Sequence, residues 1–186
     1  MNLKDAKKIL RQTIAQRKQA IRPGEKEQLS LLALSKLERL PEFEKAETVL
    51  LYHALPDELQ TAAFIQKWEN RKRLLLPVVA GEELLIKPYR KDKTVTGSFG
   101  IIEPEGEPVT RMETIDLAII PGVAFSPKGT RMGRGKGYYD RLLEKLTCPR
   151  IGICYELQVN EEVPAEPHDK PMDIIVTPER IIYCKL

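Results

Sequence analysis

Apolar residues recur at helical spacing near the start of the chain. One stripe predicts a helix over residues 2–21. Its members are Leu3, Ala6, Leu10, Ile14, Ile21 and, by its stem, Arg17. The Pro-Gly pair at residues 23–24 interrupts this stripe, and a second helix is expected over residues 25–40, ended by the sequence PEF.

Short apolar, β-rich runs alternate with helical stretches through the rest of the chain. Helices are expected at residues 61–70 and 137–146, and the Gly-, Pro-, Glu- and Lys-rich residues 90–114 are expected to be irregular surface. Strands are expected at residues 48–53, 73–79, 84–89, 115–122, 150–156, 173–177 and 180–184. This alternation predicts one α/β domain over residues 1–186, with a mainly parallel central sheet and a short antiparallel part.

The composition is that of an ordinary globular protein of 186 residues, with a formal net charge of only +3. Such a charge suits a small anionic ligand better than nucleic acid, which calls for a dense basic face. Cys148, Cys154 and Cys184 have no metal-type spacing and are expected in the core. No signal core, membrane span or heptad pattern is evident, so we expect a soluble, cytoplasmic monomer without membrane contact.

A glycine-rich segment is the strongest candidate for chemistry. Four of the eleven glycines lie within residues 129–137, among Arg131, Arg134 and Lys136. The segment follows a buried strand and precedes a helix, where open α/β sheets bind ligands. Glycines allow close backbone approach, and helix-start N–H groups favour anions. The spacing fits neither a P-loop nor a dinucleotide fingerprint. The pattern favours an anion or phosphate site over a flexible basic surface loop.

Two aspartates have both a structural and a functional interpretation. Asp140 falls in the first turn of the expected helix, where it could complement the helix dipole or bind Mg²⁺. Asp169, in a later loop, could be a second carboxylate ligand or a turn residue.

The stretch PGVAFSPKGTRMGRGKGYYDRLL resembles the characteristic segment of the 5-formyltetrahydrofolate cyclo-ligase, or methenyltetrahydrofolate synthetase, family. Further blocks agree: KKILR at residues 7–11, LPDELQT at 55–61 and VPAEPHDKPMD at 163–173. The likeness covers almost the whole chain. It implies a three-layer α/β/α fold of the NagB/RpiA-like kind.

The resemblance also implies site residues. The ATP-binding set is Lys7, Lys8, Ile9, Leu10, Arg11, Arg131, Met132, Gly133, Arg134, Gly135, Lys136, Gly137, Tyr138 and Tyr139. The folate-binding set is Arg11, His53, Glu58, Arg134, Gly135, Lys136, Gly137 and Tyr138. Arg131, Arg134 and Lys136 would act in catalysis, and Asp140 and Asp169 would bind Mg²⁺.

The implied activity is the ATP- and Mg²⁺-dependent conversion of 5-formyltetrahydrofolate to 5,10-methenyltetrahydrofolate, with release of ADP and phosphate. Taken alone, the residues allow plainer interpretations. Lys7, Lys8 and Arg11 would be a solvated helix face, Asp57 and Glu58 turn and helix-start residues, and Tyr138 and Tyr139 half-buried helix anchors. Two other functions stay open: an enzyme acting on a sugar phosphate without ATP, and an RNA-binding module that uses the basic loop.

Overall fold

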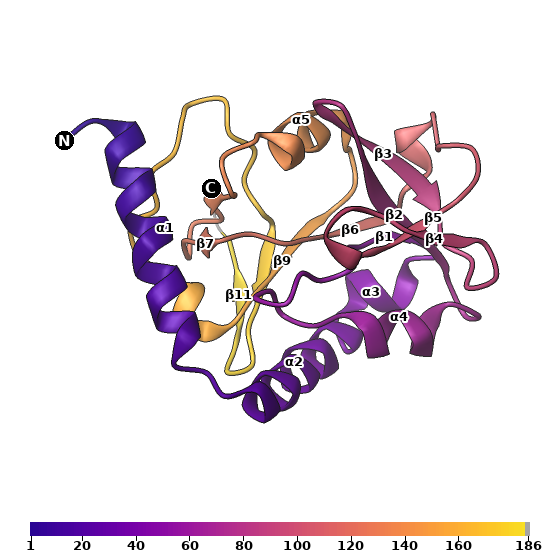
Figure 1. Ribbon diagram of the computed structural model, residues 1–186, viewed down its shortest axis with the longest axis horizontal. Helices are drawn as coiled ribbons and strands as arrows, with labels where there is room; N and C mark the ends of the chain where they lie inside the picture. The colour runs from indigo at the N-terminus through magenta and orange to yellow at the C-terminus, as the bar shows by residue number, and fades with distance from the viewer. Residues whose placement is uncertain (185–186) are drawn as a thin grey trace.

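Runs of Leu, Ile and Val form the strands of a seven-stranded central sheet in this computed structural model, which describes residues 1–184 (Figure 1). The order is β11-β10-β9-β6-β1-β2-β3. The strands are β1 (Thr48–Leu50), β2 (Arg73–Ala80), β3 (Glu83–Pro88), β6 (Leu117–Ile120), β9 (Arg150–Ile153), β10 (Ile174–Val176) and β11 (Ile181–Tyr183). The inner strands β10, β9, β6, β1 and β2 are parallel, and β3 and β11 pair antiparallel at the edges. The expected mainly parallel sheet with a short antiparallel part is confirmed.

Alternate residues of each strand face opposite helical layers. On one face, Val49 and Leu51 join a core with helices α2 (Pro23–Glu38), α3 (Pro41–Lys45) and α4 (Ala62–Trp68). On the other face, Leu50 packs with α5 (Tyr138–Lys145). Figure 1 shows the first group below the sheet and α5 above it. The period of two along a strand therefore produces the three-layer α/β/α arrangement that the family resemblance implies.

Helix α1 (Leu3–Gln19) does not cover a face of the sheet. It stands at one side, beside the short strand β7 (Ala124–Phe125) (Figure 1). Ile14 is fully buried in a small cluster with Ala124 and Met132. The expected burial of the Arg17 stem is wrong: Arg17 is exposed, and Lys18 is the buried residue at 5% exposure.

The prolines begin helices instead of ending them. The second helix starts at Pro23, two residues before the expected position, and Pro41 starts α3. Proline suits the first helical position, because the N–H group that it lacks would have no partner there.

Some structure lies where the sequence predicted none. Residues 90–114 hold the antiparallel pair β4 (Thr94–Thr96) and β5 (Ile102–Pro104), with the 3₁₀ turns η1 (Ser98–Gly100) and η2 (Met112–Thr114). A third 3₁₀ turn, η3 (Glu156–Gln158), follows β9. Three-residue strands are too short to leave a readable alternation.

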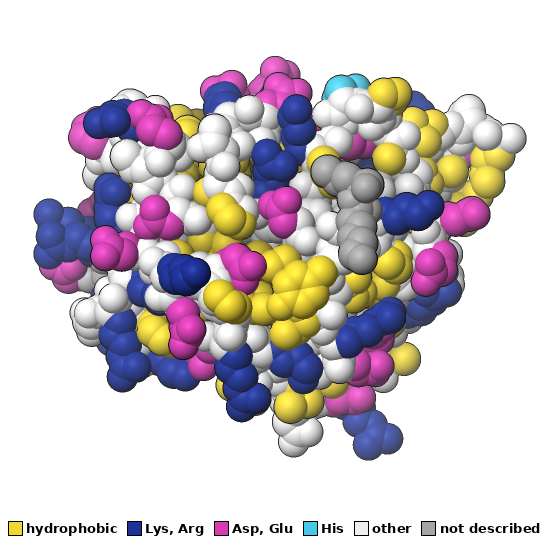
Figure 2. Space-filling view, turned by 180° about the vertical axis from the view of Figure 1, so that it is seen from behind, with side chains coloured by type: hydrophobic (Ala, Val, Ile, Leu, Met, Phe, Trp, Pro, Cys, Tyr) yellow, Lys and Arg dark blue, Asp and Glu magenta, His cyan; other side chains and the backbone are white. Residues whose placement is uncertain are grey.

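The positions of the cysteines and of the charged side chains can be compared with what the composition predicted. Cys154 is buried and Cys148 and Cys184 are partly buried, all three as free thiols. Figure 2 shows one face of the molecule, on which basic and acidic side chains are interspersed around a central apolar area. Within residues 1–184, no helix is long and apolar enough to cross a membrane.

Candidate functional site

The candidate residues gather where three parallel strands end. His53 and Glu58 follow β1, the glycine-rich segment follows β6, and η3 follows β9. These strands are direct neighbours in the order β9-β6-β1. Parallel neighbours place their carboxyl ends at one edge of the sheet, so segments distant in sequence converge there.

The glycine-rich segment has a defined shape. The segment, residues 129–137, begins inside a hairpin. In this hairpin Ala124 pairs with Met132 of β8 (Arg131–Met132), and Phe125 pairs with Arg131. After the hairpin, Gly135 has φ +106°, and Gly137, which caps α5, has φ +71°. A side chain at either position would strain the backbone. The glycines therefore fix the path of the backbone into α5.

Arg131 lies beneath this segment and not on its surface. Its Nε donates to the Pro121 carbonyl at 2.7 Å, and its guanidinium lies 5.0 Å from the Tyr139 ring centre. Nη1 is 3.4 Å from Oδ1 of Asp140. Burial lowers the pKa of Arg131, although Asp140 and Tyr139 act in the opposite direction. Arg131 thus connects Pro121, the residue that follows β6, with Asp140 in the first turn of α5.

The N-terminal helix brings part of the KKILR block to the same place. Arg11 Nε donates to the Gly133 carbonyl at 2.9 Å, and its guanidinium faces Gly135. Lys7 forms an ion pair with Glu166 at 3.3 Å. Lys8 and Ile9 lie on the exposed side of α1. The structure thus joins Lys7 and Arg11 to the other candidates and leaves Lys8 and Ile9 apart.

An ionic cluster connects the glycine-rich segment with the turn after β1. Arg134 Nη2 lies 2.8 Å from Oδ1 of Asp57 and 3.9 Å from Oε2 of Glu58. The other oxygen of Asp57 is 3.7 Å from Lys18 Nζ. Burial alone would raise the pKa of Asp57, but the Arg134 hydrogen bond and the Lys18 charge lower it.

Glu58 and His53 are less solvated than ordinary turn residues. Glu58 Oε1 accepts a hydrogen bond from the Leu55 N–H at 2.8 Å, and burial raises its pKa against the opposing charge of Arg134. Burial lowers the pKa of His53, so the neutral imidazole is favoured. His53 Nδ1 is buried and has no hydrogen-bond partner among the described residues. Glu58 and the unpartnered Nδ1 of His53 are thus polar groups in a poorly solvated part of this edge.

The end of the segment is tied to the turn between β2 and β3. The Tyr138 hydroxyl donates to the Gly81 carbonyl at 3.1 Å. Arg141 Nη2 donates to the carbonyl of Glu82 and, at 3.0 Å, to that of Lys136. The Lys136 side chain is exposed. The backbone of residue 136 is thus held while its ammonium can reach a ligand.

The two predicted metal ligands belong to different groups. Asp140 pairs with Arg131, whereas Asp169 lies with Glu166 and His168, whose ligand atoms are within 4.8 Å of one another. Both aspartates lie close enough to Arg131 to favour its charged form. Carboxylates from two separate groups therefore influence this guanidinium.

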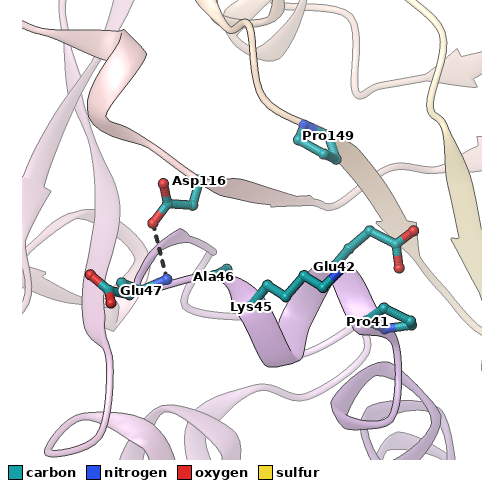
Figure 3. A pocket seen from close by; sticks show the side chains of 7 residues that line it. All are labelled: Pro41, Glu42, Lys45, Ala46, Glu47, Asp116 and Pro149. Atoms are coloured by element: carbon teal, nitrogen blue, oxygen red, sulfur yellow. Dashed lines mark hydrogen bonds between the residues drawn. The ribbon is translucent and has the colours of Figure 1, made fainter.

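A surface hollow of about 460 Å³ lies at the opposite edge of the sheet (Figure 3). It is lined by Pro41, Glu42, Lys45, Ala46, Glu47, Asp116 and Pro149. Several of these residues directly precede β1, β6 and β9, and Asp116 accepts a hydrogen bond from the Glu47 N–H at 3.0 Å. Three carboxylates and one ammonium disfavour a polyanion here. The hollow is unsuited to a phosphate ligand.

The sequence alone did not identify Lys18 or Arg141 as site residues. It indicated Asp57 as a turn residue and did not predict its contacts with Lys18 and Arg134. Lys18 lies eleven residues after Lys7 and seven after Arg11, so helical spacing could have placed it on their face. Arg141 gave no such signal, because its partners are backbone carbonyls, that of Glu82 in a distant hairpin and that of Lys136 just before α5.

The chain is similar to known proteins over most of its length. A family model described as the 5-formyltetrahydrofolate cyclo-ligase family matches residues 3–178. A 5-formyltetrahydrofolate cyclo-ligase of Escherichia coli strain K12 is 31% identical over 179 residues, which are 90% of this chain and 98% of that protein. A probable 5-formyltetrahydrofolate cyclo-ligase of Schizosaccharomyces pombe is 32% identical over 164 residues, covering 77% and 80%.

Solved structures show the same likeness. The NMR structure of Aquifex aeolicus 5,10-methenyltetrahydrofolate synthetase superposes with a TM-score of 0.87 at 35% identity, covering 97% of this chain and 93% of that one. A 5,10-methenyltetrahydrofolate synthetase from Mycoplasma pneumoniae gives 0.71 at 28% identity, covering 92% and 98%. The likeness extends over nearly the full length of both folds.

The raised pKa of Glu58 predicts a pH-dependent contribution to stability. The folded protein holds the Glu58 proton to higher pH than the unfolded chain does. This carboxyl therefore lowers the free energy of unfolding as pH rises from below the unfolded-chain pKa to above the folded one. In Glu58→Gln that decline should be absent, whereas Glu162→Gln, which removes an exposed carboxylate, should retain it. Urea unfolding across acidic to neutral pH measures both. A constant difference between Glu58→Gln and wild type at all pH values would contradict the interpretation.

Proposed function

Because this chain belongs to the 5-formyltetrahydrofolate cyclo-ligase family, we propose that it converts 5-formyltetrahydrofolate and ATP to 5,10-methenyltetrahydrofolate, ADP and phosphate. One observation carries the assignment to this site. Arg11 and the turn that holds Asp57 and Glu58 converge on the glycine-rich segment at the carboxyl edge of the sheet, where they contact Gly133 and Arg134. In this arrangement, the basic glycine-rich segment would bind the phosphates of ATP. The partly buried carboxylate of Glu58 beside it would bind the pterin ring.

The proposed chemistry proceeds by phosphoryl activation. The formyl oxygen attacks the γ-phosphorus of ATP, the bond from that phosphorus to the bridging oxygen breaks, and ADP leaves. N10 of the folate then attacks the activated formyl carbon and loses its proton. The carbon–oxygen bond breaks, phosphate leaves, and the carbon bridges N5 and N10. No covalent enzyme intermediate is needed, so positioning and electrostatic stabilisation carry the catalysis.

Arg134 and Lys136 are the proposed donors to the transferring phosphoryl group. Both side chains are exposed at the segment, and the Arg134 ion pair with Asp57 lies at the surface, where such pairs are weak and exchange readily. Arg11 stands beside Gly135 and would reach the same ligand. Arg131 is only 7% exposed, and its guanidinium lies against Gly133. Its proposed role is therefore to support the Gly133 backbone and to present one edge of the guanidinium to the phosphates.

Glu58 and His53 are the proposed contacts for the pterin. An ionised carboxylate accepts hydrogen bonds well from the amino and ring N–H donors at the pyrimidinone edge. Oε2 of Glu58 lies 3.9 Å from Arg134 Nη2, and this positive charge favours the ionised form against the effect of burial. The neutral His53 imidazole, which also follows β1, would be a second polar contact for the same ligand.

Asp140 and Asp169 are the proposed residues for Mg²⁺. Magnesium on nucleotides is usually held by one or two carboxylates, phosphate oxygens and water, and it neutralises phosphate charge. The donor set fits this requirement, because Asp140 is part-exposed beside the segment and Asp169 has Glu166 and His168 close by. Lys7, paired with Glu166, would hold that second group near the phosphates.

The purified protein should convert 5-formyltetrahydrofolate only when ATP and Mg²⁺ are both supplied. The near-ultraviolet absorbance of 5,10-methenyltetrahydrofolate measures the product, and ADP release measured in parallel should match it one for one. Folded protein that gives no ATP-dependent rise would refute the proposed reaction.

Arg134→Ala and Lys136→Ala should each lower kcat/KM by roughly 10²-fold, as loss of a donor to the transition state commonly does. Lys128→Ala is the matched control, because Lys128 is exposed in the turn of the same hairpin, away from the segment that follows β8. Steady-state kinetics on all three proteins provide the comparison. Wild-type rates in both Arg134→Ala and Lys136→Ala would exclude these side chains from catalysis.

A further inference from the structure

Lys18 is a buried cation that the proposed reaction does not use. It lies in the last turn of α1, and its side chain is only 6% exposed. The charged and titratable groups that influence it come from three other parts of the fold: Asp57 and Glu58 after β1, Arg134 in the glycine-rich segment, and Cys154 after β9. A lysine is rarely buried so deeply without a partner that holds its charge.

Asp57 is that partner, and it faces two cations at once. Oδ2 lies 3.7 Å from Lys18 Nζ, and Oδ1 lies 2.8 Å from Arg134 Nη2. The half-exposed aspartate thus joins a buried lysine on one side to an exposed arginine on the other. Lys18, Asp57 and Arg134 connect α1, the turn after β1 and the glycine-rich segment.

The two ion pairs of Asp57 differ in how far their cations are exposed to water. A surface pair such as Arg134–Asp57 is weak alone, because water and mobile side chains compete with it. Lys18 is enclosed, and its neighbour Ile14 on the helix is fully buried. Loss of the Asp57 carboxylate would leave the enclosed Lys18 charge without its partner, so this contact is costly to break even though Asp57 itself is half-exposed. The orientation of Asp57 then restricts where the Arg134 guanidinium can stand.

We infer that Lys18 is a positioning residue, which acts through Asp57 to hold Arg134 at the mouth of the phosphate-binding segment. The inference rests on the proposed function, in which Arg134 meets the transferring phosphoryl group. Small misplacements of such a group reduce rates strongly. Loss of Lys18 should therefore affect kcat more than the KM for ATP.

The test compares Lys18→Met, which keeps the length and removes the charge, with Lys18→Arg, which keeps the charge. Lys18→Met should lower kcat roughly 10-fold or more with KM for ATP changed by about threefold or less, as loss of positioning predicts. Lys18→Arg should restore most of kcat. Arg17→Met is the matched control, since Arg17 is the adjacent exposed residue and contacts Asn160 at 3.4 Å. In an Asp57→Asn background, Lys18→Met should have little further effect.

Equal kcat values for Lys18→Met and Arg17→Met would overturn the inference. So would an equal loss from Lys18→Met with and without Asp57→Asn, because Lys18 would then act on another group. If Lys18→Met does not fold, Asp57→Asn alone decides, since Asp57 is half-exposed. A lowered kcat in that variant supports the inference, and an unchanged kcat overturns it.

Wild-type turnover, measured first, separates this inference from the proposed function. If wild type shows no ATP-dependent turnover, the proposed reaction fails, and calorimetric titration with inorganic tripolyphosphate tests the positioning role alone. A weaker Kd in Lys18→Met than in Arg17→Met would support that role, and equal Kd values would overturn it.

Discussion

The packing of α1 against the β7–β8 hairpin is the constraint on which the site depends. Ile14 is buried against Ala124 and Met132, and on the same side of the helix Arg11 donates to the Gly133 carbonyl. Burial of apolar side chains supplies most of the stability of this contact, and the hydrogen bond fixes the position of the helix relative to the hairpin. Without α1, the glycine-rich segment would lose Arg11, Lys7 and Lys18 together. The N-terminal helix, which covers neither face of the sheet, is therefore part of the candidate site.

The direction of the sheet divides the molecule into two chemically different edges. At the carboxyl ends of β1, β6 and β9 lie the arginines, the lysines and the glycine backbone. At the amino ends lies a hollow lined by Glu42, Glu47 and Asp116. By charge alone, the first edge favours a polyanion and the second disfavours one. Carboxylates also occur at the basic edge, where Asp57, Asp140 and Glu166 each pair with a cation. This pairing limits the cost of gathering so many positive charges in one place.

Local patterns in the sequence predicted α1, α2, α4, α5 and most strands of the central sheet, because periodicity is a local property. They also placed the glycine-rich segment between a buried strand and a helix, as the structure has it between β6 and α5. The hairpin of β7 and β8 was not predictable, since two-residue strands carry no alternation. Helical spacing after Ile14 favoured Arg17, whereas the structure buries Lys18, whose partner Asp57 lies 39 positions further along the sequence. Contacts such as Arg11 with Gly133 depend on the tertiary fold alone. For those, resemblance to a family supplied what the residues by themselves could not.

The most direct test of the account maps where a nucleotide binds. Backbone amide NMR signals can be followed while a non-hydrolysable ATP analogue and Mg²⁺ are added to the ¹⁵N-labelled protein. The account predicts the largest shifts at residues 133–139 and at Lys7 and Arg11 of α1. Shifts confined to the acidic hollow around residues 41–47 and Asp116, at the opposite edge of the sheet, would contradict it.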